Sequence, residues 1–389
     1  MTAGSAGPGA ATDRAHGPAG GPMPPRQLVL AAGRHERVDR IPVTPYMGNY
    51  GAVLAGVPID RYCTDASAMA QAQLEAQRLI GQDMLVAQSD GYYMAEALGM
   101  RTYRRPGTTP APQAWPVADL ASIDALRIPD PRRDGRMPVY LDAVRMLRDA
   151  AGERLAVRAC GTGAFSLAGH LMGPDRFVLA LALLEVEPDP AAERRLRLLM
   201  EITTETTTRF ALAALEAGAD VVMDGDSLAS LDMISPQLYE RWAWPFERAF
   251  FERVRPAADA SGALTLLHIC GDTTPILPLM ARTGAHILEI DWKVELAAAR
   301  DAAAAPTDNA PQPAPALMGN LDPTSALLQG SPGLVLSLAR AAIRAGSAPW
   351  PGGLAGVGRP SITGFLLGSG CEVAPGTPPE NMRAMVRAC

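Results

Sequence analysis

The sequence predicts a single-domain α/β protein with the (β/α)8 TIM-barrel fold. Two observations support this fold class. Short apolar runs alternate with longer helical patterns along the 389 residues, and we count eight such runs. Each run is nearly all apolar, which is typical of parallel strands that are buried on both faces. Eight strand and helix units favour a closed barrel, and an open doubly wound sheet stays the alternative.

The predicted strands are spread over the whole chain. In order, they are residues 41–46, 84–89, 155–160, 220–224, 264–269, 286–290, 316–319 and 362–367. Glycines that can end a helix before a strand mark five junctions: Gly81, Gly152, Gly218, Gly284 and Gly346. Residues 193–217 have an amphipathic pattern that predicts a long outer helix. Ser235 and Asp322, each followed by proline, are expected to cap helices.

Four segments are predicted to lie outside the barrel elements. Residues 1–27 are rich in Gly, Ala and Pro and predict a flexible tail, which leaves residues 28–389 for the barrel. Residues 302–315 and 347–360 predict loops because of their Ala, Gly and Pro content. Residues 101–131 contain many prolines and follow the second strand, so we expect a lid at the catalytic mouth.

Charge and composition exclude several classes of function. The formal net charge of −6 comes without a long basic run, so no nucleic acid or anionic membrane surface is expected as a partner. No apolar run has the length of a transmembrane helix and no signal peptide is recognisable, which predicts a cytoplasmic protein. No Gly-x-Gly-x-x-Gly motif follows the first strand, so a nicotinamide cofactor is not expected.

Three residues at predicted strand ends are candidate metal ligands. His268 and Cys270 lie two apart at the end of the fifth strand, where the period of two places both side chains on one face. Cys371 follows the eighth strand, and the ends of all barrel strands share one rim. One His and two Cys suit Zn²⁺ and leave one coordination position open. Spacing alone also fits a simpler interpretation, in which all three are ordinary buried side chains.

Other polar residues are candidates for binding a substrate. Asp226, Asp291 and Asn320 follow the fourth, sixth and seventh strands, where barrel enzymes place their chemistry. His170 lies beyond the third strand. A structural role is the alternative for each of these residues. Side chains alternate in direction along a strand, so some of the polar residues at the strand ends should point away from the mouth.

Three segments of the chain resemble one known family. They are HICGDTTPILPLMARTGAHILEID, MGNLDPTSALLQGSP and GFLLGSGCEVAPGTPPENMRAMV. These segments resemble the uroporphyrinogen decarboxylase superfamily, and in particular its branch of corrinoid-dependent methyltransferases, which includes methylcobamide:coenzyme M methyltransferases. The resemblance extends over about residues 28–388.

The resemblance implies ligands for a metal and a lining for the site. In that branch the His-x-Cys pair and the distant Cys bind zinc, which implies that His268, Cys270 and Cys371 are catalytic zinc ligands here. Relatives often add an acidic fourth ligand after the sixth strand. Trp292 stands where Glu or Gln is frequent, so Asp291 is the first candidate for that ligand, before Glu289 and Glu372. Glu96 resembles a segment that lines the substrate site of the family.

The resemblance also implies an activity. We expect a zinc-dependent methyltransferase that moves a methyl group between a corrinoid (cobalamin) and a thiol or a methylated (O-methyl or S-methyl) small molecule. The chain lacks the Asp-x-His-x-x-Gly motif of corrinoid carriers, so the corrinoid is expected on a partner protein or as free cobalamin.

Two alternatives stay open beside methyl transfer. The first is a uroporphyrinogen decarboxylase-like lyase that acts on a porphyrin-type substrate. Decarboxylases carry an arginine-bearing Met-Arg-Gln-Ala-Gly-Arg motif for substrate carboxylates, whereas this chain has Ile-Pro-Val-Thr-Pro-Tyr-Met-Gly-Asn-Tyr-Gly. The second is a non-catalytic corrinoid- or zinc-binding partner protein, and an open zinc site favours catalysis over that role.

Overall fold

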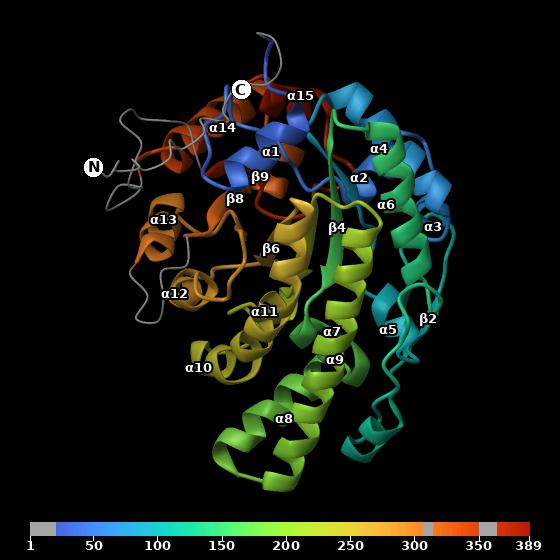
Figure 1. The fold of residues 1–389 in the computed structure, drawn as a ribbon. Helices are drawn as coiled ribbons and strands as arrows, with labels where there is room; N and C mark the ends of the chain where they lie inside the picture. The colour runs from blue at the N-terminus through green and yellow to red at the C-terminus, as the bar shows by residue number, and fades with distance from the viewer. Residues whose placement is uncertain (1–20, 306–313, 350–363) are drawn as a thin grey trace, which may run out of the picture.

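The computed structural model describes residues 21–305, 314–349 and 364–389, and its core is a curled parallel sheet surrounded by helices (Figure 1). The strand order is β1-β4-β5-β6-β7-β8-β9, and every pair is parallel. The strands are β1 Met84–Ala87, β4 Ala156–Thr162, β5 Val221–Gly225, β6 Leu264–Ile269, β7 Ile287–Ile290, β8 Ala316–Leu321 and β9 Phe365–Ser369. The predicted single-domain barrel architecture is confirmed, with seven of the eight expected strands.

The first predicted strand, residues 41–46, is wrong as a strand. It makes only a single parallel bridge, between Val43 and Leu367 of β9. Pro42 and Pro45 have no N–H group to donate, so a continuous ladder cannot form on both sides of this segment. Val43 also accepts a backbone hydrogen bond from the residue that precedes β1. The segment therefore connects the two edges of the sheet, where an eighth strand would lie.

The helices follow the strands in the alternation that the sequence predicts. They are α1 Pro25–Gly33, α2 Gly48–Leu54, α3 Ile59–Tyr62, α4 Ala66–Ile80, α5 Tyr93–Ala97, α6 Met137–Ala151, α7 Ala164–Met172, α8 Pro174–Val186, α9 Pro190–Glu216, α10 Pro236–Leu238, α11 Trp244–Ser261, α12 Leu277–Met280, α13 Leu296–Ala304, α14 Pro332–Gly346 and α15 Pro379–Val386. The long outer helix predicted over 193–217 is confirmed as α9. Ser235 and Asp322 cap their helices as expected, because each side chain accepts hydrogen bonds from backbone N–H groups of the first turn.

Helix α1 corrects the predicted tail. Residues 1–20 lie outside the described residues, but α1 begins at Pro25, inside the segment expected to be flexible. Its Leu28 and Val29 are buried in a core formed by the inward-facing side chains of the strands, among them Leu264 and Ile287. Those residues lie at the amino-terminal ends of β6 and β7. Helix α1 therefore closes the amino-terminal end of the barrel.

The predicted loops are only partly described. Residues 306–313 and 350–363 lie outside the described residues, while α13 extends into the first predicted loop as far as Ala304. The proline-rich connection over 101–131 contains an antiparallel hairpin, β2 Arg101–Tyr103 and β3 Ala111–Ala114. Its function as a lid stays a prediction.

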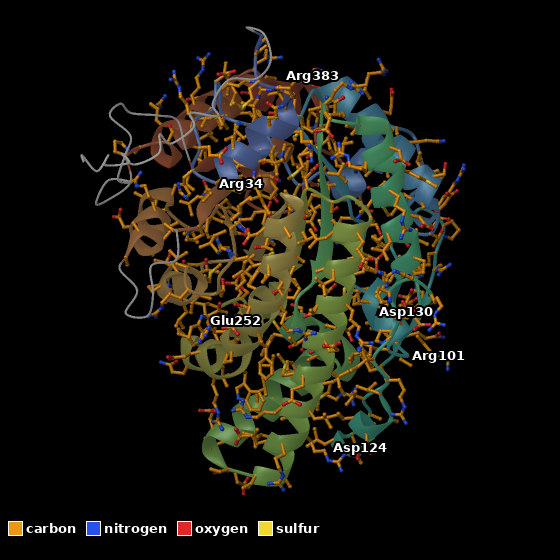
Figure 2. All side chains as sticks on the ribbon, in the orientation of Figure 1. Arg34, Arg101, Asp124, Asp130, Glu252 and Arg383 are labelled. Atoms are coloured by element: carbon orange, nitrogen blue, oxygen red, sulfur yellow. The ribbon has the colours of Figure 1, made fainter. Side chains whose placement is uncertain are left out.

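Charged side chains lie on the outside of the helical layer, for example Glu252 on α11 and Arg383 on α15 (Figure 2). In the described residues, no single helix has the length and apolarity needed to cross a membrane. Within the described ranges, α7 and α8 meet that test as a pair, and they are bent by 107° relative to each other.

Candidate metal centre

His268, Cys270 and Cys371 meet at the carboxyl-terminal ends of the strands. His268 is the fifth residue of β6, Cys270 follows that strand directly, and Cys371 comes two residues after the end of β9. Their ligand atoms all lie within 4.8 Å of one another. The distance from His268 Nε2 to Cys270 Sγ is 3.1 Å, and the two sulfur atoms are 3.4 Å apart. Two strands that are distant in the sequence thus bring together the three residues predicted as ligands.

The donor atoms of this cluster fit a zinc ion. Zn–S bonds of about 2.3 Å and Zn–N bonds of about 2.0 Å in a tetrahedron require ligand atoms about 3.5 to 3.8 Å apart. The distances between the donor atoms here are about 0.4 Å shorter than that requirement. Both cysteines are partly exposed while His268 is buried, so the cluster is reached from the side of the sulfur atoms.

The two thiols differ in acidity because one donates a hydrogen bond to the other. The bond from Cys371, opposed by burial, lowers the pKa of Cys270. The same bond and burial raise the pKa of the Cys371 thiol. Cys270 therefore loses its proton first, and a metal ion that binds both sulfur atoms must displace the proton of Cys371.

A buried ion pair lies behind His268. Glu289 of β7 places Oε2 at 3.2 Å from His268 Nδ1, in an electrostatic contact that lacks the alignment of a hydrogen bond. Arg158 of β4 pairs with both oxygens of Glu289, at 2.7 and 2.6 Å. Burial disfavours the imidazolium, but the charge of Glu289 and the contact with Cys371 leave the pKa of His268 raised. Sequence reasoning missed Arg158, although an arginine inside an otherwise apolar strand was a signal.

Asp291 and Glu372 do not belong to the three-residue cluster, whereas Glu289, the second candidate for a fourth ligand, contacts His268 on the side away from the thiols. Asp291 is buried, and its Oδ1 accepts a hydrogen bond from the backbone N–H of Lys293 at 2.9 Å. Its function as a ligand stays a prediction. Glu372 is held through Oε1, which accepts hydrogen bonds from the backbone and side chain of Asn49 at 2.7 and 3.2 Å. Burial raises the pKa of Glu372 to about 7.

Asp226 binds the amino-terminal end of α7. Its two oxygens accept hydrogen bonds from the backbone of Phe165 and Ser166, at 3.1 and 2.6 Å, and from the Ser166 hydroxyl at 2.7 Å. The side chain is fully buried. These contacts are those of a structural residue, and substrate binding by Asp226 stays a prediction.

Asn320 connects two strand ends. Its Nδ2 donates hydrogen bonds to the backbone oxygens of Asp291, at 3.2 Å, and Val294, at 2.7 Å. The side chain thereby holds the segment after β7, which carries the first candidate for the fourth ligand. Substrate binding by Asn320 stays a prediction as well.

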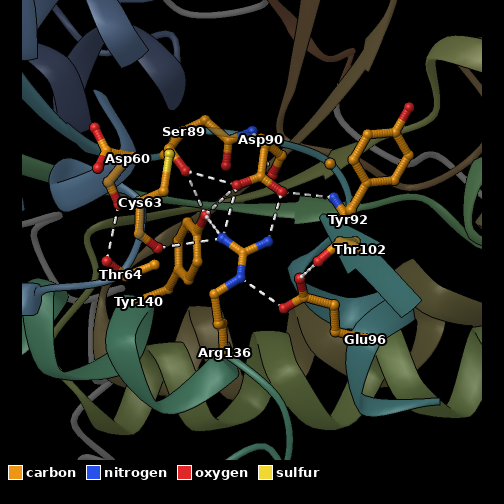
Figure 3. A network of polar contacts seen from close by, with 12 residues as sticks. Asp60, Cys63, Thr64, Ser89, Asp90, Tyr92, Glu96, Thr102, Arg136 and Tyr140 are labelled. Carbon is orange, nitrogen blue, oxygen red and sulfur yellow. Dashed lines mark hydrogen bonds and ion pairs between the residues drawn. The ribbon is translucent and has the colours of Figure 1, made fainter. Parts of the chain in front are cut away.

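Glu96 belongs to a polar network around Arg136 (Figure 3). Its Oε2 accepts a hydrogen bond from Arg136 at 2.6 Å, and its Oε1 accepts one from Thr102. Arg136 also pairs with both oxygens of Asp90, at 2.8 and 2.9 Å, and both partners are buried. Sequence reasoning singled out Glu96 but neither Asp90 nor Arg136. Both oxygens of Glu96 are thus used within the protein, and its contact with substrate stays a prediction.

His170 lies on α7 against the residues that follow β1. Its ring is 4.8 Å from the ring of Tyr92, measured between centroids, and its Cε1 lies next to Gly91. Burial lowers the pKa of His170 to about 4, so the ring is neutral at neutral pH. Its Nδ1 is buried and makes no hydrogen bond to the described residues. Substrate binding by His170 stays a prediction.

The sequence of this chain is similar to those of two kinds of enzyme, methyltransferases and decarboxylases. The methylcobamide:CoM methyltransferases of Methanosarcina acetivorans and Methanosarcina mazei are 28% and 29% identical over 253 and 252 residues, which is 65% of this chain. The matched part spans 63% of the length of each methyltransferase. The uroporphyrinogen decarboxylase of Anaeromyxobacter dehalogenans is 28% identical over 376 residues, which covers 92% of this chain and 96% of that protein.

A solved structure confirms the fold, and a family model covers nearly the whole chain. The structure described as a methyltransferase from Methanosarcina mazei superposes with a TM-score of 0.76, at 24% identity, over 94% of this chain and 98% of that one. The model of the uroporphyrinogen decarboxylase (URO-D) family matches residues 24–389. The resemblance that the sequence segments indicated is therefore confirmed, and the chain belongs to the uroporphyrinogen decarboxylase family.

Proposed function

We propose that this protein is a zinc-dependent methyltransferase, which moves a methyl group between a corrinoid (cobalamin) and a thiol or a methylated small molecule. The observation that carries the proposal is the cluster of His268, Cys270 and Cys371. Similarity to two proteins named methylcobamide:CoM methyltransferase supports it. The corrinoid would come from a carrier protein or as free cobalamin.

The three clustered side chains fit zinc by their chemistry as well as by their spacing. One imidazole and two thiolates are borderline-soft ligands, and three protein ligands leave one position for a sulfur atom of the substrate. When bound, zinc lowers the pKa of a thiol and so provides a thiolate near neutral pH. The partly exposed Cys270 and Cys371 place that position on the accessible side of the cluster. Asp291 is our first candidate for a ligand that the substrate displaces.

The second candidate function is a decarboxylase-like lyase, which the similarity over nearly the full length to uroporphyrinogen decarboxylases favours. A substrate with several carboxylates needs cationic partners in its site. In the described part of the chain, Arg158 and Arg136 are buried near the candidate residues, and both are paired with carboxylates of the protein. Methyl transfer is therefore the better supported function.

The metal content of the purified protein tests the first step of the proposal. We expect about one zinc per chain, because one cluster with three ligands is present among the described residues, and we expect Cys270→Ala to lose it. Cys389→Ala is the matched control, because it deletes an exposed thiol outside the cluster and should keep the zinc. Zinc that is retained unchanged in Cys270→Ala would contradict the site.

Turnover separates methyl transfer from the alternatives. The protein is incubated with methylcobalamin and a panel of thiols, and the loss of the cobalt–methyl absorbance is followed. In the reverse direction, reduced cobalamin is incubated with O-methyl and S-methyl compounds. Loss of carbon dioxide from a porphyrinogen, without methyl transfer, would favour the lyase. Cobalamin binding without any turnover would favour a non-catalytic corrinoid- or zinc-binding partner protein.

A further inference from the structure

The ion pair of Arg158 and Glu289 crosses the interior of the barrel. Arg158 belongs to β4 and Glu289 to β7, and two other strands separate these in the sheet. Both side chains have 0% exposure, and the pair is bidentate. The guanidinium also lies over the ring of Tyr46, 4.6 Å from its centroid. A salt bridge in this position is thus fully removed from water.

Stability alone does not account for a charged pair in this place. The surrounding interior core is made of apolar residues such as Val86, Leu266 and Met318. Burying two charges costs several kcal/mol of solvation per ion, and replacing such a pair by apolar side chains is often neutral or stabilising. The pair therefore needs a reason other than the strength of the fold, and its contact with His268 supplies one.

Glu289 lies next to the ring nitrogen of His268 that faces away from the thiols. Its Oε2 is 3.2 Å from Nδ1, while Nε2 is 3.1 Å from the sulfur of Cys270. A carboxylate beside Nδ1 favours a proton on that nitrogen and leaves the lone pair of Nε2 free for a metal ion. The rings of Tyr46 and His268 also form a T-shaped pair, with 6.2 Å between the centroids. These two contacts restrict the orientation of the His268 ring, with Nε2 on the side of the thiols.

The charges also balance when the metal is bound. Two thiolates, from Cys270 and Cys371, cancel the charge of one Zn²⁺ ion. Glu289 would add an uncompensated negative charge to this buried place, and Arg158 cancels it. An unpaired buried charge is costly, so a metal centre with Glu289 but without a cation beside it would be disfavoured.

From this geometry we propose that Glu289 and Arg158 are positioning residues of the metal centre. Glu289 orients His268 so that Nε2 faces the metal, and Arg158 fixes Glu289 and neutralises its charge. The inference rests on the zinc site of the proposed function. It gives Glu289, the second candidate for the fourth ligand, a role through Nδ1 of His268 in place of direct contact with the metal.

The test measures zinc affinity by competition with a chromophoric chelator in Glu289→Gln, Arg158→Met and Arg158→Lys. We expect Glu289→Gln and Arg158→Met to bind zinc about 10- to 100-fold more weakly, as is typical when the partner of a metal-bound histidine is lost. Arg158→Lys keeps the charge and should recover part of the affinity. In the Co²⁺-loaded protein, Glu289→Gln should shift the ligand-field absorption bands, because the imidazole is no longer held in one orientation.

The control is Arg148→Met, which breaks a different ion pair. Arg148 pairs with the buried Asp220, which lies just before β5 at the opposite end of the barrel. This variant should lose thermal stability without changing zinc affinity. If Arg158→Met does not fold, the nearly isosteric Glu289→Gln carries the test.

Two different results would overturn the inference. Wild-type protein that binds no zinc would overturn the proposed metal centre and this inference with it. Wild-type protein that binds zinc, with unchanged affinity and Co²⁺ spectrum in Glu289→Gln and Arg158→Met, would overturn the inference alone and leave a purely structural ion pair.

Discussion

Among single residues, His170 gives the clearest expected response to pH. Its folded pKa of about 4 lies below the value of about 6.5 for a free histidine, so the unfolded chain binds the additional proton. The stabilisation is complete above about pH 6.5 and is lost as pH falls toward 4, to an extent of at most about 3 kcal/mol. His286 has the same pKa direction and should behave alike.

Chemical denaturation between pH 4 and 7 checks this expectation. In His170→Gln, the loss of unfolding free energy on acidification should be smaller than in the wild-type protein. Part of the loss should remain, because burial also lowers the pKa of His35 and of His286. His286→Gln serves as the reciprocal control. An unchanged pH dependence in His170→Gln would show that His170 is not neutral in the folded protein.

At the same scale, the sequence pointed to the three side chains that cluster at the strand ends and to Glu289, but not to Arg158 behind them. His268, Cys270 and Cys371 could be found because strand ends share one rim and because the motifs resemble a family. Arg158 could not be assigned a partner, since 131 positions separate it from Glu289 and many carboxylates in the chain could have paired with it. Side-chain contacts across a barrel follow from three-dimensional packing, which one sequence does not encode locally.

At the scale of elements, Asp226 connects the end of β5 to the beginning of α7. We expect Asp226→Ala to lower the free energy of unfolding by about 1–3 kcal/mol, because buried N–H donors at the helix start lose their acceptor. Urea denaturation measures this loss. Asp189→Ala removes the N-cap of α9, which lies at the surface, and should cost only about 1 kcal/mol.

The outcome for Asp226→Ala also bears on the candidate substrate role. A stable variant that has lost methyl transfer would show that Asp226 contacts substrate as well. Equal losses in Asp226→Ala and Asp189→Ala would contradict the stronger, buried cap.

Two elements show where the sequence pattern predicts the wrong local structure. Residues 41–46 have the apolar composition of a strand, but two prolines limit the hydrogen bonds that the backbone can make. Helix α1 follows a Gly- and Pro-rich start, and that composition predicts a tail where the helix begins. It is a short helix that burial against the strands stabilises, and local propensity does not report such burial.

For the molecule as a whole, the contact between α1 and the barrel interior should contribute strongly to stability. Leu28 is 1% exposed within that core. Leu28→Ala should therefore lower the free energy of unfolding by about 2–5 kcal/mol. Leu179→Ala on α8 is the control, because that leucine is 58% exposed and its loss should have little effect. A small effect of Leu28→Ala would mean that α1 is only loosely attached.

The closure by α1 also has a kinetic consequence. With one end of the barrel filled, the proposed methyl transfer requires its donor and its acceptor to approach the cluster from the strand ends that carry Cys270 and Cys371. A wide, flat corrinoid seated over this single entrance would block passage of the small molecule. We therefore expect ordered kinetics, in which the small substrate binds first and a carrier-bound corrinoid leaves before the small product does. Product-inhibition patterns measure that order, and random binding would show a second route to the metal.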